Sequence, residues 1–467
     1  MPSNVPSSST AADAGARAEA AGTTLERSLS LRDLIVYGLL FIGPTAPMGV
    51  YGVLDAKSGG VSPLVFVVAT VAMGFTAWSY ARMSASVPRA GSVFAYATAG
   101  LGRTPGFIAG WMVGLDYLFI PSLAALFTGV ATHALLPGLP MWLASGGAVV
   151  VITVLNLAGV RIAARVGMLM LAVEIVILAM FTVAAIVVLV HDGPARPWLS
   201  PFTGVNGFSV TAVVGAVSVA VLSFLGFDAI AGFAEENTGS SRQVGRALIF
   251  CLVLAGVLFV VQTYLGSLLT TATPAQLAAH PADQGSAFYT MLQHAISGWF
   301  GTTVTTVRAI GPIFSALVGQ AAVSRLMLGM ARDGHLPRVL ATVNPRTRTP
   351  LAATLVAAVL TAIISVSASL RADGLDLLSS LVTVGALTAF VFLHASVVGY
   401  FGVRRQGSGR GVADFAVPVV GAAIIIAVLV EASRLALAVA GVWLVIGLLV
   451  HLAGSLRGRR RAPGSVG

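Results

Sequence analysis

Two short segments of this sequence combine glycine, proline and polar residues inside runs that are otherwise apolar. The first, GPTAPMG, covers residues 43–49, and the second, SFLGFD, covers residues 223–228. Proline removes a backbone donor and glycine has a low helix propensity, so we expect both segments to interrupt a helix. An interruption exposes N–H groups at the start of one half-helix and C=O groups at the end of the other. These groups suit a carboxylate and an ammonium group, respectively.

We therefore expect a small polar solute to bind between the two interruptions. Amides around residues 45–49 suit a carboxylate, although Pro47 removes one of them, and carbonyls around residues 223–226 suit an amine. Asp228 either binds that amine or supports the unwound backbone, and the two nearby phenylalanines either wall a pocket or pack against other helices. The candidate substrate-binding residues are Gly43, Thr45, Ala46, Met48, Gly49, Ser223, Phe224, Gly226, Phe227 and Asp228. The alternative for the first segment is a simple proline kink.

Three further ionisable residues, Asp116, Glu174 and Arg308, lie inside apolar runs. A charge at the centre of a bilayer costs about 2.5–3.5 kcal/mol on insertion scales, so each needs a partner, a cavity or a proton. The helical rise places Asp116 and Arg308 at similar depths, which predicts an ion pair with a coupling role or only a clamping role. Glu174 then lacks a partner and is our candidate for proton coupling. Its alternative is a neutral acid bonded to a backbone carbonyl or placed near a helix end.

The composition indicates a membrane protein. Of the 467 residues, 57% are hydrophobic and 9% are charged, whereas an ordinary soluble domain is about 25% charged. The net charge of +10 comes from cations scattered between apolar runs, so we expect no nucleic acid partner. The single cysteine, Cys251, lies inside such a run and is interpreted as a packing residue. The motifs of zinc hydrolysis, acyl transfer and nucleotide binding are missing, which predicts no metal, no cofactor and no enzyme activity.

Twelve runs are apolar and long enough to cross a bilayer. An even count places both termini on one side, and a cytoplasmic amino terminus puts 22 of the 27 Lys and Arg on the cytoplasmic side. That bias predicts a multi-pass protein of the cell membrane with both termini in the cytoplasm. The runs cover residues 34–54, 63–84, 106–136, 142–160, 166–190, 210–233, 248–269, 299–330, 351–369, 377–403, 415–430 and 435–456.

The two interruptions fall in the first and sixth runs, which are corresponding positions of two five-span halves. Such pairs are typical of transporters built from inverted repeats. We therefore predict an all-α integral membrane fold with 12 transmembrane helices, a five-plus-five inverted repeat with broken helices 1 and 6, and two additional C-terminal helices. The predicted divisions are a disordered cytoplasmic tail (1–30), the first repeat (31–190), the second repeat (205–403), the last two spans (412–456) and a basic cytoplasmic tail (457–467).

Charged residues also gather where the second and sixth spans reach the cytoplasm. They either form the ion pairs of an inner gate or are solvated helix ends. The candidates are Arg82, Arg89, Glu235 and Glu236, with Arg242 and Arg246 nearby.

Four segments, in this order along the chain, resemble the amino acid, polyamine and organocation permease superfamily. They are LSLRDLIVYG (29–38), SYARMSASVPRAGSVFAYA (79–97), SFLGFDAIAGFAEEN (223–237) and SRLMLGMARDGHLP (324–337). The resemblance covers most of the chain. It departs from the family pattern at residues 43–49, where many relatives that carry amino acids have a Gly-Ser-Gly type of break. It departs again at residues 237–239, where Asn-Thr-Gly replaces the usual Asn-Pro turn.

The resemblance implies a secondary transporter that imports amino acids by alternating access, driven by a proton or by exchange. The unusual first break keeps a polyamine or other organic amine as the alternative substrate, because such a substrate has no carboxylate. A non-transporting nutrient sensor is a further alternative, and a channel or a membrane enzyme is a rival class. The partners implied are the small-molecule substrate and membrane lipid.

Overall fold

A computed structural model describes residues 27–461 of the chain except 90, 137, 159, 206, 346, 348, 372, 373, 405–410, 432 and 433. Most of the predicted amino-terminal tail and the end of the carboxyl-terminal tail lie outside the described residues. The described part is a bundle of helices, and its single β-bridge joins Leu29 to Asn237.

The first half of the bundle runs from the first span to the fifth. Its helices are α2 (Leu31–Ile42), α3 (Ala46–Ser58), α4 (Ser62–Ser86), α5 (Val93–Gly100), α6 (Arg103–Leu135), α7 (Met141–Leu157) and α8 (Val160–His191).

The remaining helices follow from a short connecting turn onward. They are α9 (Ser200–Thr203), α10 (Val210–Phe224), η1 (Phe227–Glu236), α11 (Ser241–Leu269), α12 (Pro274–Ala279), η2 (Pro281–Asp283), α13 (Ala287–Ala295), α14 (Gly298–Arg332), η3 (Arg338–Ala341), α15 (Leu351–Ser369), α16 (Gly374–Val397), η4 (Val398–Val403), α17 (Ala413–Val430) and α18 (Arg434–Arg461).

The lengths and apolar surfaces of these helices suit a bilayer. Ten continuous segments of the described chain are long and apolar enough to cross a membrane, and the bent pair formed by α2 and α3 makes an eleventh. The apolar helix α7 has 17 residues and falls just short of that length. The chain is therefore an all-helical, multi-pass membrane protein.

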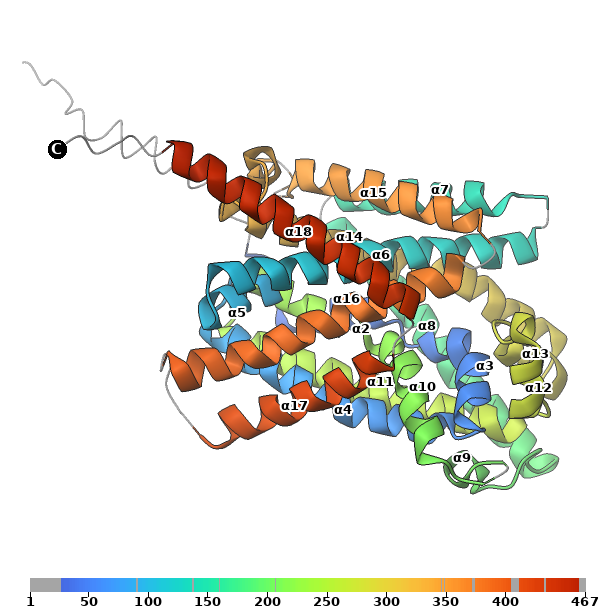
Figure 1. The fold of residues 1–467 in the computed structure, drawn as a ribbon. Helices are drawn as coiled ribbons and strands as arrows, with labels where there is room; N and C mark the ends of the chain where they lie inside the picture. Colours follow the sequence, from blue (N-terminus) through green and yellow to red (C-terminus); the bar gives the residue numbers. More distant parts are fainter. Residues whose placement is uncertain are drawn as a thin grey trace, which may run out of the picture.

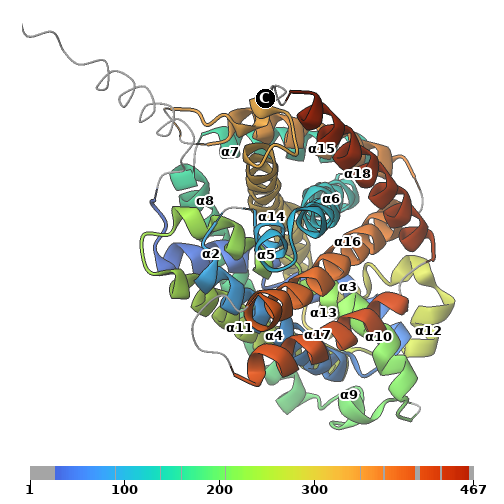
Figure 2. The ribbon, with the colours of Figure 1, turned by 60° about the vertical axis from the view of Figure 1, so that its left-hand side comes forward.

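Two long helices occupy the middle of the bundle. Helices α6 and α14 pack closely against each other and are surrounded by the other spans (Figure 2). The short helices α9, α12 and α13 gather at one end of the bundle, and α5 lies at the opposite end (Figure 1). The sequence predicts that the end with α5 faces the cytoplasm, and we call the two ends the α5 end and the α12 end.

The first span is broken, as predicted. Helix α2 ends at Ile42, Gly43 adopts a φ of 72°, and α3 begins at Ala46 after a bend of 41°. The break is narrower than residues 43–49, because Pro47 lies in the first turn of α3. Proline is tolerated there, since the N–H groups of the first turn have no partner within the helix.

The sixth span is also broken, at residues 225–226. Helix α10 ends at Phe224, and Gly226 adopts a φ of 107°, which a residue with a side chain rarely takes. The chain then continues as the 3₁₀ helix η1 over ten residues. Runs of this length are uncommon because the hydrogen-bond geometry is poorer than in an α-helix.

The half-helices on each side of the breaks pack in pairs. Toward the α12 end, α3 packs against α10, and toward the α5 end, α2 packs against η1. Tyr37 of α2 stacks on Phe233 of η1 with ring centroids 5.2 Å apart. The two breaks therefore lie side by side in the interior of the bundle.

Candidate functional site

One face of α14 lies along the break in the first span. Its residues are spaced by three or four positions, which places them on one side of a helix. They are Arg308, Gly311, Ser315 and Gly319. Arg308 Nη1 donates a hydrogen bond to Thr45 Oγ1 at 3.4 Å, and Ser315 Oγ donates to the Leu40 carbonyl at 2.8 Å. This face of α14 therefore forms one wall of the site.

Glu174 of α8 lies at the start of α3. The Glu174 carboxylate lies close enough to the Thr45 backbone N–H and to the Arg308 guanidinium to interact with both. A side chain on Gly311 would begin 2.5 Å from Glu174 Oε1, so glycine leaves the room that this carboxylate needs. The prediction that Glu174 lacks a partner is therefore wrong, because Arg308 lies beside Glu174 and not beside Asp116.

Asp228 follows the turn at Gly226 and is fully buried. Tyr117 and Tyr80 donate their hydroxyl groups to Asp228 Oδ2, at 2.5 and 3.3 Å, and the Gly226 N–H donates to Oδ1 at 3.2 Å. Asp228 supports the broken backbone in this conformation, as one of the two predicted roles requires. Substrate binding by Asp228 stays a prediction.

Asp116 of α6 is buried, and neither of its carboxylate oxygens has a hydrogen-bond partner among the described residues. Asp228 is close enough to interact with it electrostatically. The predicted ion pair between Asp116 and Arg308 is not formed, since Arg308 bonds Thr45 and, at 3.3 Å, Tyr289. Similar depth on two helices does not imply that two side chains face each other.

The two predicted phenylalanines pack against other rings. The Phe224 ring lies 6.1 Å from Phe66 and 4.9 Å from Phe259, in the core between α10, α4 and α11. Phe227 meets Tyr80 edge to face at 6.0 Å and Phe390 at 6.3 Å. Both rings are fully buried, so a role as a pocket wall stays a prediction.

The other predicted residues are divided between the two breaks. Met48 belongs to an apolar cluster with Phe288 toward the α12 end. A side chain on Gly49 would begin 3.1 Å from Arg308 Nη2. Ser223 Oγ, at the end of α10, is buried with no hydrogen-bond partner among the described residues. Gly43 and Ala46 flank the turn that separates α2 from α3.

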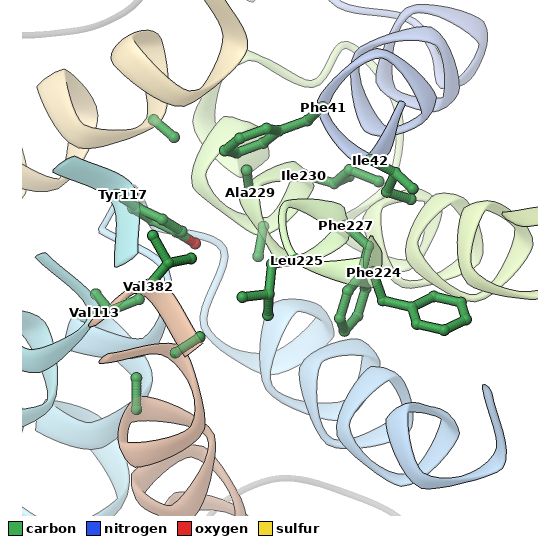
Figure 3. Packing of buried hydrophobic residues seen from close by; sticks show 14 of the residues in the cluster. Phe41, Ile42, Val113, Tyr117, Phe224, Leu225, Phe227, Ala229, Ile230 and Val382 are labelled. Carbon is green, nitrogen blue, oxygen red and sulfur yellow. The ribbon is translucent and has the colours of Figure 1, made fainter. Parts of the chain in front are cut away.

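Two further residues, Phe41 and Gln262, lie beside the breaks and were not predicted from the sequence. The Phe41 ring extends from the last turn of α2 toward Ala229 at the start of η1 (Figure 3). Gln262 of α11 donates its amide Nε2 to the Pro44 carbonyl at 2.9 Å, and its Oε1 has no partner in the part of the chain that the structure describes. A polar residue inside the apolar run 248–269 was a signal for Gln262, but no residue type singled out Phe41.

Two ion pairs lie at the α5 end. Arg325 of α14 donates Nε and Nη2 to the two carboxylate oxygens of Glu236, with 2.9 Å for the Nη2 contact, and its guanidinium lies 4.3 Å from the centre of the Phe233 ring. Arg332 pairs with Glu235 at 3.0 Å, and this pair is about one quarter exposed. The glutamates were predicted as gate residues, but their partners come from α14.

The predicted gate arginines take different places. Arg82 forms a two-bond pair with Asp414 of α17, at 2.6 and 2.7 Å, and its guanidinium lies over the Phe401 ring. Arg89 is exposed in the loop before α5. Arg82 therefore joins α4 to α17 instead of pairing with Glu235 or Glu236, because the partner of a charge depends on which helix packs beside it.

A buried ion pair that the sequence did not indicate lies at the α12 end. Arg196 donates Nη1 and Nη2 to Asp55 at 3.1 and 2.8 Å and also bonds the Ala272 carbonyl. Burial disfavours the charged guanidinium, but the hydrogen bond with Asp55 and the nearby negative groups raise the pKa of Arg196 above its usual value. The pair joins α3 to the loops that follow α8 and α11.

The site is closed toward both ends in this conformation. Thr45 and Met48 at the first break, and Phe227 and Asp228 at the second, are at most 1% exposed. A cavity of about 10 Å³ lies beside Arg325, which is room for about one water molecule. A wider surface groove of about 570 Å³ lies between the start of α2 and the start of α11.

Comparison with known proteins gives the family. The model of the family described as "Amino acid permease" matches residues 34–449. The chain belongs to this family. The resemblance to amino acid, polyamine and organocation permeases is thereby confirmed, and the chain is a membrane transport protein.

Curated relatives of this permease differ in the substrates that their names give. The low-affinity putrescine importer PlaP of Escherichia coli K12 is 26% identical over 434 residues, which cover 91% of this chain and 93% of PlaP. The branched-chain amino acid permease BcaP of Bacillus subtilis is 30% identical over 80% of this chain and 81% of BcaP. The methylthioribose transporter of Bacillus subtilis is 28% identical over 86% of both chains. All three are named as transport proteins.

Proposed function

We propose that this permease imports a small organic amine without a carboxylate, such as a short diamine, across the cell membrane. The observation that carries the proposal is the buried carboxylate of Asp116, which has no hydrogen-bond partner among the described residues and lies close to a second buried carboxylate, Asp228.

Two neighbouring carboxylates inside a bilayer need a cation or a proton between them. Neutral donors from Tyr117, Tyr80 and Gly226 satisfy Asp228, but Asp116 has nothing equivalent. An isolated buried charge is costly, and like charges in one site make it costlier. An ammonium group that binds beside Asp116 would remove both penalties.

The start of α3 argues against a substrate carboxylate. The positive end of that half-helix and the Arg308 guanidinium would attract a carboxylate, but the carboxylate of Glu174 already lies close to both of them. Pro47 has no N–H to offer. The chain thus supplies its own carboxylate where the carboxylate of an amino acid would bind.

Two neutral acceptors extend the site for an amine. Ser223 Oγ lies at the sixth-span break, and Gln262 Oε1 belongs to the side chain that bonds Pro44 at the first-span break. Both are buried and without a partner among the described residues. They can accept hydrogen bonds from a second ammonium group of a diamine. The similarity to PlaP, a putrescine importer, supports the same substrate class.

An amino acid is the second candidate substrate. It is favoured by the family description and by the branched-chain amino acid permease of Bacillus subtilis. For such a substrate, Glu174 would have to leave the Thr45 N–H when the substrate carboxylate arrives. The two candidates therefore differ in whether Glu174 must move.

We further propose that transport follows alternating access in a 12-span, five-plus-five inverted repeat with both termini in the cytoplasm. The ion pairs of Glu236 with Arg325 and of Glu235 with Arg332 would close the cytoplasmic side, and the pair of Asp55 with Arg196 would close the outer side. The proposed repeats are residues 31–190 and 205–403, followed by two spans in residues 412–456.

Glu174 remains our proposed proton-coupling group. It is buried beside the first-span break and faces Arg308. A proton on Glu174 would remove the attraction between its carboxylate and the Arg308 guanidinium. It would also weaken the interaction of that carboxylate with the Thr45 backbone N–H. Proton uptake would thereby change the contact between α8 and the break. Exchange of one substrate for another needs no such group and is the alternative mode.

The test is uptake into liposomes that contain the purified protein. Labelled putrescine and leucine are supplied separately to the wild type, Asp116→Asn and, as a control, Asp192→Asn, which changes an exposed aspartate. We expect wild-type uptake of putrescine, loss of most of it in Asp116→Asn and no change in Asp192→Asn. Uptake of leucine but not putrescine by the wild type would refute the amine proposal, as would full putrescine uptake by Asp116→Asn.

A further inference from the structure

The Phe41 ring fills the space between the sixth-span break and α14. It is 2% exposed. A side chain on Gly226 would begin 2.6 Å from Phe41 Cγ, and one on Gly319 would begin 3.0 and 3.1 Å from Phe41 Cε2 and Cζ. The base of the ring therefore touches Gly226 and its tip touches Gly319. A ring held in this way bridges two spans that flank the candidate site.

The two glycines differ in what their backbones require. Gly226 has a φ of 107°, so its backbone alone favours glycine. Gly319 lies inside the long helix α14, where glycine costs about 1 kcal/mol relative to alanine and no turn requires it. A side chain there would also begin 2.9 Å from Pro121 Cγ of α6. The missing side chain at Gly319 therefore makes room for the Phe41 ring.

The same space borders the groups that would hold the substrate. Gly226 lies two residues before Asp228, and Gly319 lies one turn beyond Ser315 on the wall of α14. The carbonyl of Leu40, next to Phe41, accepts the Ser315 hydroxyl. Phe41 is also in the last turn before the first-span break. Because Gly226 contacts the Phe41 ring and also bonds Asp228, an amine bound beside Asp228 would lie close to that ring.

We propose that Phe41 determines the size of substrate that this permease accepts, because its ring must share the space between Gly226 and Gly319 with the hydrocarbon part of the substrate. A short chain fits beside a slightly displaced ring, and a bulky one does not. The inference rests on the proposed amine transport, which it deepens by limiting the substrate to short, slender amines.

The test compares the uptake of putrescine with that of the bulkier phenethylamine. We expect Phe41→Ala to raise the ratio of phenethylamine to putrescine uptake by at least about tenfold, the lower end for changing the fit of a hydrophobic pocket. Phe41→Leu should raise this uptake ratio less. It keeps more of the buried side chain, so the test can still be made if the alanine variant folds poorly. The matched control is Phe259→Ala, which removes a fully buried ring from the cluster with Phe66 and Phe224 and should leave the ratio unchanged.

The reverse change supplies an independent readout. Gly319→Ala should slow the uptake of putrescine because its methyl group meets the Phe41 ring as well as Pro121. The double variant Phe41→Ala/Gly319→Ala should restore the part of the uptake that is lost through the Phe41 ring. An unchanged ratio in both Phe41 variants, with putrescine uptake intact, would overturn the inference. If the wild type takes up no amine, the proposed function fails, and the role of Phe41 in setting substrate size is then tested by the uptake ratio of phenylalanine to alanine in the same variants.

Discussion

Removal of the Glu236 carboxylate should open the cytoplasmic side of the protein. Glu236→Gln leaves the Arg325 guanidinium charged and buried, with its side chain only 4% exposed. Loss of one partner from a buried ion pair costs about 3–5 kcal/mol, mostly because the other charge stays unpaired. In the proposed open conformation, water would hydrate Arg325 and this cost would be avoided, so the substitution should destabilise the closed conformation selectively.

The expected shift is large because each 1.4 kcal/mol changes an equilibrium tenfold. A cost of about 3–5 kcal/mol raises the ratio of open to closed protein by about two to three and a half powers of ten. The double variant Glu236→Gln/Arg325→Gln removes both charges and should shift the equilibrium much less. Glu235→Gln breaks the pair with Arg332, which is about one quarter exposed. It should change the ratio by less than about tenfold, since exposed pairs contribute about 0–1 kcal/mol.

The native cysteine reports this opening without any engineered label. Cys251 is the single cysteine of the chain, is fully buried, and donates its thiol to the Ile35 carbonyl of α2 at 3.5 Å. A membrane-impermeant thiol reagent applied from the cytoplasmic side reaches Cys251 only when α2 moves away. The rate of labelling should rise at least about 100-fold in Glu236→Gln. A rate equal to that of the wild type would refute the role of this ion pair in closing the cytoplasmic side.

Three further changes test other parts of the molecule. Asp55→Asn leaves Arg196 buried and unpaired, so it should favour opening at the outer side and slow the labelling of Cys251 from the cytoplasm; faster labelling would contradict the proposal. Glu174→Gln should abolish the pH dependence of net uptake in liposomes but leave substrate exchange unchanged; unchanged pH dependence would rule out Glu174 as the proton-coupling group. Gly421→Ala should lower the melting temperature, because its methyl group would overlap the His394 ring at a cost of about 1–3 kcal/mol.

The two breaks could be predicted because their causes are local. Glycine and proline act on their own backbone, so residues 43–49 and 223–228 indicated both interruptions before any packing was known. The structure differs from this prediction only in how many residues each break covers. Pro47 was counted with the unwound segment, but the first turn of α3 accommodates it. The apolar runs likewise indicated the spans, because the length of each is set by the bilayer and not by its neighbours.

The partners of the buried charges could not be predicted because they depend on how each helix is rotated. The rise per residue placed Asp116 and Arg308 at similar depths. In the structure, however, Arg308 and Ser315 lie on the face of α14 that contacts the first span, whereas Asp116 lies near Asp228. Phe41 was missed for a related reason. Its importance comes from the two glycines around it, and only the packed structure brings these three residues together.

The strand-like contact between the segments that flank the half-helices α2 and η1, at the α5 end, has a mechanical consequence. The Leu29 N–H bonds the Glu236 carbonyl and the Thr238 N–H bonds the Leu29 carbonyl, both at 2.9 Å, and Tyr37 stacks on Phe233. These contacts join α2 to η1 at their base. In the proposed alternating access, the two half-helices would therefore move together and expose the interior between both of them at once, instead of along one half-helix alone.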